Sequence, residues 1–145
     1  MNKAEKAIEY FDLYNCAQAV LSAYAADYDL EKDKALQVAV GFGGGLGGHQ
    51  DVCGAISGAI SVLGLHSGFK EEDRREKIRK VYAEVYRYIN EFTEREGTIK
   101  CRELLNCDLN SDEGKAFYRE HNLKDQCRGY VRLCCELLDK YLAEA

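Results

Sequence analysis

The chain has 145 residues, of which 31% are charged and 46% are hydrophobic. This composition is typical of one folded soluble domain and argues against a disordered chain. The net charge of -5, with lysines and arginines interspersed among acids, argues against a nucleic-acid-binding face. The start of the chain is polar, and the apolar stretch 52–65 is shorter than the roughly 20 residues of a membrane span. We therefore expect residues 1–145 to form a single cytoplasmic domain with no membrane span.

Three helices are predicted in the first forty residues. Asn2 and Glu5 resemble a capping box, and apolar residues follow them at helical spacing. Asn15 can cap a second helix that ends near residue 26, with Gln18 as its reciprocal partner. A third helix is expected over residues 30–40.

A glycine-rich segment separates these helices from a central one. Six of the eight residues from Gly41 to Gly48 are glycine, and Asp51 can cap a helix over residues 52–65. This stretch is apolar or small on every side, which predicts a buried helix. The small residues Gly54 and Gly58 would allow neighbouring backbones to approach closely.

The remaining helices are also predicted from capping residues and apolar spacing. Acids open a long helix over residues 71–96, which ends at Gly97. Its expected inward stripe comprises Ile78, Val81, Val85, Ile89 and Phe92, while Tyr82, Tyr86 and Tyr88 are expected in packing and at the rim. Thr98 begins a short helix, Ser111 begins another, and Asp125 caps the last one. The predicted fold class is all-α, a compact multi-helix bundle with a glycine-rich loop before a central buried helix.

The chain contains seven cysteines, an odd number that cannot all pair internally. In a reducing compartment, such usage indicates metal binding or thiol chemistry before structural disulfides. The capping residues place Cys16, Cys53, Cys101 and Cys127 in the first turn of a helix. Cys107 follows a helix end, and Cys134 and Cys135 lie in the middle of the last helix. Since free cysteine is also among the most buried residue types, inert core thiols remain an alternative.

A position in the first helical turn favours the thiolate, because the unpaired N–H groups and the helix dipole make that end positive. The thiolate is both the nucleophile and the metal ligand. The four cysteine-bearing helices alternate with three others, over residues 30–40, 71–96 and 111–120. If successive helices run antiparallel, all four cysteines meet at one end of the bundle.

The glycine-rich loop can serve this site in several ways. Backbone N–H groups at Gly43, Gly44 and Gly45 could form a nest for an anion or a cluster and cover Cys53. A GxGxxG match in this segment lacks a βαβ unit, so dinucleotide binding is not favoured. His49, four residues before Cys53, could act as a base or a ligand for that thiol, although an isolated loop histidine is more often solvated.

Four parts of the sequence resemble a known family. Cys16, the element CGAISG at residues 53–58, Cys101 and Cys127 are similar to the redox-active proteins labelled by a C…GCAxxG…C…C pattern. The literal order of that label is not met, since Val52 precedes Cys53, but the element CGAxxG is met in full. The resemblance implies redox activity based on cysteines, without a reaction or a substrate. It assigns no role to Cys107, Cys134 or Cys135.

Three functions remain open from the sequence. In the first, a possible oxidoreductase, Cys53 attacks as the thiolate, and Cys16, Cys101 or Cys127 resolves the mixed disulfide formed with an unidentified redox partner. In the second, the same four cysteines bind zinc or an iron–sulfur cluster, although their spacings match no compact finger or ferredoxin signature. In the third, the chain is a helical interaction module with inert thiols. Each of these three functions is compatible with a homodimer.

Overall fold

The computed structural model describes residues 1–144 as an all-α molecule. Its α-helices are α1 (Lys3–Phe11), α2 (Cys16–Tyr24), α3 (Lys32–Ala39), α4 (Gly43–Leu46), α5 (Gly54–His66), α6 (Arg74–Glu96), α7 (Cys101–Leu105), α8 (Asp112–Glu120) and α9 (Leu123–Leu142). Short 3-10 turns occupy Ala25–Tyr28, Val40–Phe42 and Glu71–Asp73. The predicted all-α fold class is confirmed. Among the described residues, no helix is both long enough and apolar enough to cross a membrane.

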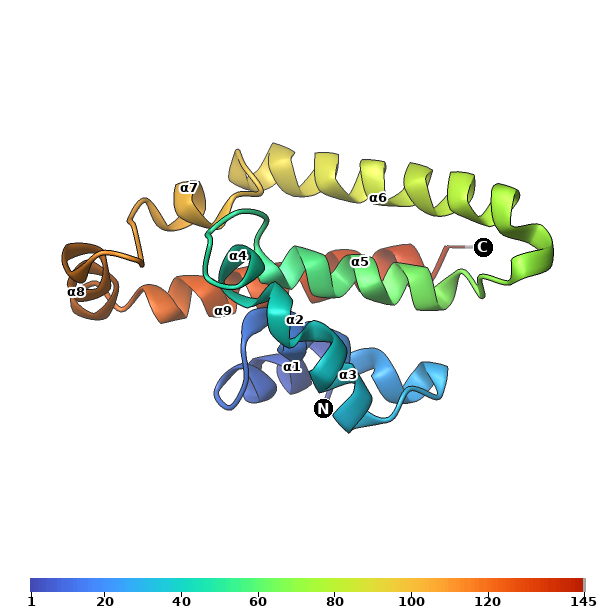
Figure 1. Cartoon of the computed structure of the whole chain (residues 1–145), viewed down its shortest axis with the longest axis horizontal. Helices are drawn as coiled ribbons and strands as arrows, with labels where there is room; N and C mark the ends of the chain where they lie inside the picture. The colour runs from blue at the N-terminus through green and yellow to red at the C-terminus, as the bar shows by residue number, and fades with distance from the viewer. Residues whose placement is uncertain (145) are drawn as a thin grey trace.

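Helices α2 and α5 form the centre of the bundle. Helix α2 packs against α1, α3, α5 and α9, and α5 also contacts α6 and α9 (Figure 1). All residues from Cys53 to Leu65 are buried or half-buried, as the sequence predicts for a central helix. Gly58 faces α2 directly, because a Cβ atom there would lie 2.8 Å from the Ala17 carbonyl oxygen.

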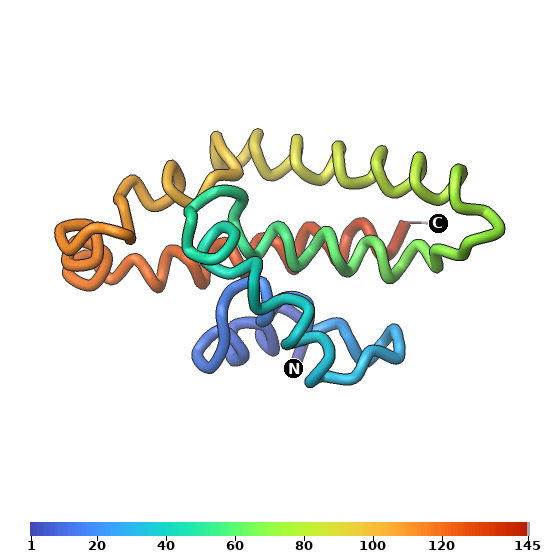
Figure 2. The backbone as a smooth tube through the Cα atoms, in the orientation of Figure 1, coloured from blue at the N-terminus to red at the C-terminus, as the bar shows by residue number. Residues whose placement is uncertain are grey.

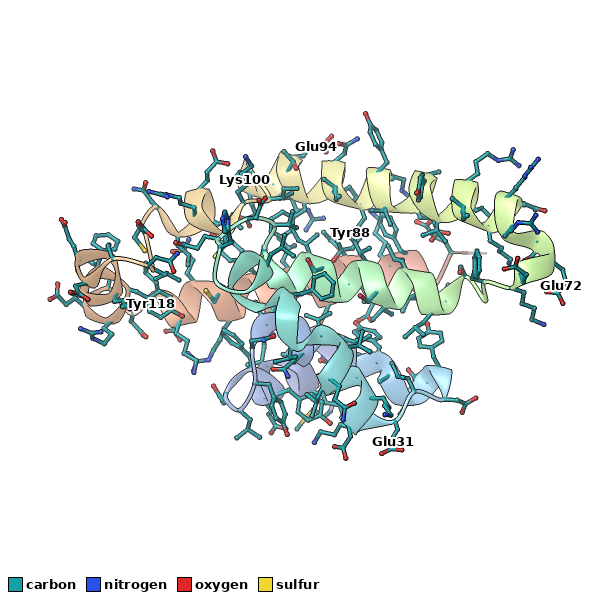
Figure 3. The ribbon with its side chains drawn as sticks, in the orientation of Figure 1. Glu31, Glu72, Tyr88, Glu94, Lys100 and Tyr118 are labelled. Carbon is teal, nitrogen blue, oxygen red and sulfur yellow. The ribbon has the colours of Figure 1, made fainter. Side chains whose placement is uncertain are left out.

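The long helix α6 turns back along α5 to form a helical hairpin, which Figure 2 shows as a continuous trace. Its C-terminal cap is Gly97 in the left-handed conformation, as expected. The expected inward stripe is wrong at its first position, since Ile78 is 42% exposed. Of the tyrosines expected in packing and at the rim, Tyr88 is fully buried, and its hydroxyl donates to the Cys134 carbonyl at 2.7 Å. Figure 3 shows Tyr88 below α6, on the side that faces the other helices.

The structure corrects three predicted helix starts. Helix α5 begins at Gly54 with Cys53 as its N-cap residue, so Asp51 is not the cap. Helix α7 begins at Cys101 and not at Thr98. Helix α9 begins after Asn122, which adopts the left-handed conformation, and Asp125 lies inside the first turn. The residues just before α5 and α7 pair with each other, which accounts for the later starts of these two helices.

Candidate functional site

Cys16 is fixed by a complete capping box at the start of α2. The Asn15 side chain accepts from the Gln18 N–H at 2.9 Å, and the Gln18 side chain accepts from the Asn15 N–H at 3.0 Å. Asn15 also donates through Nδ2 to the Val40 carbonyl at 2.9 Å, which ties this helix start to the segment before the glycines. These bonds confirm the predicted cap and make Cys16 the first residue of its helix.

Cys53 and Cys101 are brought together by a short antiparallel backbone pairing. Val52 and Lys100 form an isolated β-bridge. The Cys53 N–H donates to the Ile99 carbonyl at 2.8 Å, and the Cys101 N–H donates to the Asp51 carbonyl at 2.7 Å. Side chains alternate in such a pairing, so residues 53 and 101 point to the same side. The pairing uses the Asp51 backbone and moves the start of α5 beyond it.

Cys127 is the fifth residue of α9 and therefore lies in its second turn, which corrects its predicted first-turn position. The Tyr118 hydroxyl lies 3.9 Å from its sulfur, and Figure 3 shows this tyrosine beside the start of α9. The side chain of the preceding residue, Gln126, donates to the Leu104 carbonyl at 2.8 Å. These contacts fasten the start of α9 to α7 and α8.

Cys16, Cys53, Cys101 and Cys127 line one small space of about 30 Å³, hereafter the thiol cavity. Its lining is Cys16, Cys53, Gly54, Cys101, Leu104, Leu105, Cys127 and Tyr130. Helix α4 contacts α2, α5 and α7, the helices from which Cys16, Gly54 and Cys101 line the cavity (Figure 1). Thiols from four distant segments therefore share one apolar pocket.

Gly54 leaves the room that the Cys16 sulfur occupies. A Cβ atom at residue 54 would overlap the Cys16 Sγ atom and would lie 3.0 Å from the Phe42 carbonyl oxygen. Real Cβ atoms avoid such separations because repulsion rises steeply below van der Waals contact. The glycine of the CGAxxG element is therefore required for the packing of a sulfur from another helix.

Burial, and not the helix dipole, controls the acidity of these thiols. It raises the pKa of Cys101 to about 11 and that of Cys127 to about 12. It also raises the pKa of Cys53 and Cys16, although backbone N–H groups at the starts of α5 and α2 oppose the rise. Desolvation disfavours the charged form more strongly than the few N–H groups favour it. The predicted lowering of these pKa values is therefore wrong, and the thiols are neutral at pH 7.

The glycine-rich segment contributes to the site differently from expectation. Gly43 and Gly45 are buried, and the Gly44 N–H faces the Cys16 sulfur, not Cys53. Gly45 adopts a φ of 69°, and a Cβ atom there would lie 2.6 Å from the Asp51 nitrogen, so glycine is required at this position. His49 is exposed and does not line the thiol cavity. The histidine is therefore not placed to act on Cys53.

Gln50 is a site residue that the sequence analysis missed. It is 3% exposed, and its side-chain Nε2 lies 3.9 Å from the Cys101 sulfur and donates to the Cys107 carbonyl at 3.0 Å. Its Oε1 accepts from the Leu109 N–H at 2.7 Å. One buried amide therefore fixes the chain that follows α7 against the thiol cavity. The only signal in the sequence is a polar residue beside a predicted cap, which does not distinguish Gln50 from any loop residue.

Shortening this amide is expected to lower stability. Gln50 has a φ of 58°, which asparagine tolerates well, but the asparagine side chain is one methylene too short to reach Cys107 and Leu109. We expect Gln50→Asn to lower the free energy of unfolding by about 2 kcal/mol, because two partly buried backbone groups lose their partners. Urea denaturation measures the change. The same substitution at exposed Gln37, which should alter stability by less than about 0.5 kcal/mol, is the control, and an equal effect at both positions would contradict the assigned role.

Three cysteines lie outside the thiol cavity. Cys134 and Cys135 are fully buried in α9, where the Tyr24 hydroxyl donates to the Cys135 carbonyl at 3.2 Å. Cys107 is half-buried and follows α7. The Cys53 sulfur contributes to the raised pKa of Cys134, so the core thiols extend inward from the cavity.

Four cysteines are the donor set of structural zinc sites and of iron–sulfur clusters. Within residues 1–144, however, no three His, Cys, Asp or Glu side chains are arranged to hold a metal ion. The four thiols therefore share a cavity in which the described side chains do not adopt the geometry of metal ligands.

Comparisons with known proteins identify the family to which the chain belongs. The family model described as "Putative redox-active protein (C_GCAxxG_C_C)" matches residues 14–141, a range that includes all four cavity cysteines. A protein of Archaeoglobus fulgidus named "Uncharacterized protein" is 32% identical over 126 residues, with 78% of this chain and 83% of the relative covered. No solved structure matches the chain significantly. The chain therefore belongs to the family that this model describes, C_GCAxxG_C_C.

Proposed function

We propose that the protein stores and transfers electrons through reversible disulfide formation among Cys16, Cys53, Cys101 and Cys127. The observation that supports this function is the thiol cavity, in which four thiols from distant segments line an apolar space of about 30 Å³. Inert core cysteines have no reason to gather, since any apolar side chain of similar size fills a core equally well.

The chemistry of the cavity is a two-electron oxidation. Two neighbouring thiols become one disulfide, releasing two protons and two electrons to an acceptor, which in thiol–disulfide exchange is the disulfide of a partner. Burial raises the pKa of the cavity thiols, so the reduced site is neutral and reacts slowly until a thiol is deprotonated. Slow reaction in the resting state protects the site from adventitious oxidants.

The test is to purify the protein anaerobically, determine its metal content and visible spectrum, and then titrate its thiols before and after oxidation by hydrogen peroxide. We expect oxidation to remove thiols in pairs and peptide mapping to place the new disulfides among the four cavity cysteines. Cys135→Ala, at a buried thiol outside the cavity, should leave this pattern unchanged. Cys53→Ser should remove at least one of the disulfides.

Two other outcomes would contradict the proposal. Stoichiometric zinc, or iron with visible absorption, would identify a four-cysteine metal site instead. Thiols that all stay unreactive until the protein unfolds would indicate a helical interaction module with inert cysteines.

A further inference from the structure

The thiol cavity is too small to admit a substrate. A space of about 30 Å³ holds little more than one water molecule, and its lining is apolar apart from the sulfurs. A molecule that carries a disulfide does not fit into a space of this volume. If electrons are exchanged with such a molecule, a thiol at the edge of the site must meet it first.

Cys107 lies outside the thiol cavity and lines an open space. It lines a second space of about 240 Å³ near the start of α8, together with Asp108, Glu113 and Phe117. Cys107 is half-buried, as are Cys16, Cys101 and Cys127, but it is the cysteine that lines this larger space. This space, hereafter the entry cavity, is large enough for the end of a small disulfide or for a side chain of a protein substrate.

Cys107 is also connected to the thiol cavity. The Gln50 Nε2 atom lies 3.9 Å from the Cys101 sulfur and 3.0 Å from the Cys107 carbonyl oxygen. The chain between them turns sharply at Asn106, whose φ is 53°. Cys107 is close enough to Cys101 and Cys127 to disfavour ionisation of both thiols. The residue therefore lies between the entry cavity and the buried thiols.

The entry cavity has an acidic character. Glu113 has no ion-pair partner among the described residues, and Asp108 has only a long contact with Arg102 at 3.9 Å. No lysine, arginine or histidine lines the space. A positively charged group next to the reacting disulfide would therefore be attracted, and a negatively charged group repelled.

We propose that Cys107 is the exchange thiol of this protein and that its substrates are disulfides flanked by positive charge. The inference rests on the proposed redox function of the thiol cavity. The Cys107 thiolate attacks one sulfur of the substrate, forming a mixed disulfide and releasing the first substrate thiolate. The Cys101 thiolate then attacks the Cys107 sulfur, releasing the second thiolate and leaving a Cys101–Cys107 disulfide. The substrate gains two electrons, the protein loses two, and the two protein protons pass to the released thiolates.

Reaction of the reduced protein with two small disulfides tests the proposal. Cystamine carries two positive charges, and dithiodipropionate carries two negative ones. At low ionic strength we expect cystamine to react at least about tenfold faster, with the difference shrinking as salt screens the carboxylates. Glu113→Gln should reduce this ratio several-fold, whereas Glu120→Gln, at an exposed position on the same helix outside the entry cavity, should not.

Two cysteine variants locate the reacting sulfur. Cys107→Ser should lower the rate with cystamine at least tenfold, while peroxide still oxidises the cavity thiols. Cys101→Ser should stop at a mixed disulfide between cysteamine and Cys107, visible as an added mass on the peptide that contains residue 107. A wild-type rate in Cys107→Ser, or an adduct on another cysteine in Cys101→Ser, would overturn the assignment.

The outcomes separate this inference from the proposed function. If peroxide forms no disulfide among the four cavity cysteines of the wild type, the redox function itself fails. If peroxide forms them but Cys107→Ser still reacts normally with cystamine, only the assignment of Cys107 fails. Thermal denaturation of each variant, compared with the wild type, shows that the measured protein is folded.

Discussion

Replacing Gly54 by alanine is expected to destabilise the protein by about 3 kcal/mol and to disrupt the thiol cavity. The new methyl group would overlap the Cys16 sulfur and would lie 3.2 Å from the Ala17 nitrogen. Helices α2 and α5 are packed around this contact, so neither the sulfur nor the backbone can move away without opening the centre of the bundle. Overpacking of a well-filled core costs about 1–3 kcal/mol, and contact with backbone atoms places this site at the upper end.

Gly64→Ala provides the matched control, because Gly64 lies in the same helix and a Cβ atom there would meet nothing within 4 Å. Alanine is the better helix former, so this variant should be stabilised by about 0.5–1 kcal/mol. Urea denaturation gives both changes, and the rate of Cys16 alkylation in the native protein reports the cavity. If both alanine variants gained stability, the close contact between Gly54 and Cys16 would be refuted.

The second large expected effect is the pH dependence of Cys101 alkylation. Burial raises the pKa of Cys101 to about 11 and that of Cys127 to about 12, compared with about 8.5 for an unperturbed thiol. At pH 8 the thiolate fraction of Cys101 is therefore roughly two hundredfold lower than in the unfolded chain. We expect its alkylation rate in the native protein to be lower by the same factor and to rise about tenfold per pH unit up to about pH 11. Fast alkylation of Cys101 at pH 7 would show that the thiolate is favoured after all.

The same shifts make the folded state sensitive to alkali. Above about pH 8.5 the unfolded chain loses thiol protons that the native protein keeps until pH 11 or 12. The native state then binds more protons than the unfolded state, so the free energy of unfolding falls as pH rises through this window. Tyrosines and lysines titrate here as well, and a Cys127→Ser variant isolates the thiol contribution. Its stability should fall less between pH 7.5 and pH 10.5 than that of the wild type. Equal losses in the two proteins would count against the raised pKa of Cys127.

The parts of the fold that depend on neighbouring residues could be predicted from the sequence. The Asn15–Gln18 capping box and the Gly97 C-cap involve groups only a few positions apart, so their residue types identify them directly. The burial of α5 is likewise predicted by the apolar and small residues within the helix itself. These local signals were sufficient to predict an all-α fold and to place Cys16 at the start of its helix.

The parts that depend on distant residues could not be predicted in the same way. Asp51 has the side chain of a good cap, but its carbonyl accepts from Cys101, and the pairing with residues 99–102 delays the start of α5. The acidity of the thiols was misjudged for the same reason. A helix start is visible in the sequence, whereas the enclosure of a sulfur by Leu104 and Tyr130 is a property of the assembled fold.

The bridge between Val52 and Lys100 also has a consequence for how the protein matures. The two residues are separated by the whole α5–α6 hairpin, and contacts of such long range form late, because closing a long loop is entropically unfavourable. A chain that has made its helices but not this bridge would still expose Cys53 and Cys101 to solvent. The reactivity of these two thiols therefore falls only at the last stage of folding. Incompletely folded or damaged molecules would carry reactive thiols that the folded protein shields.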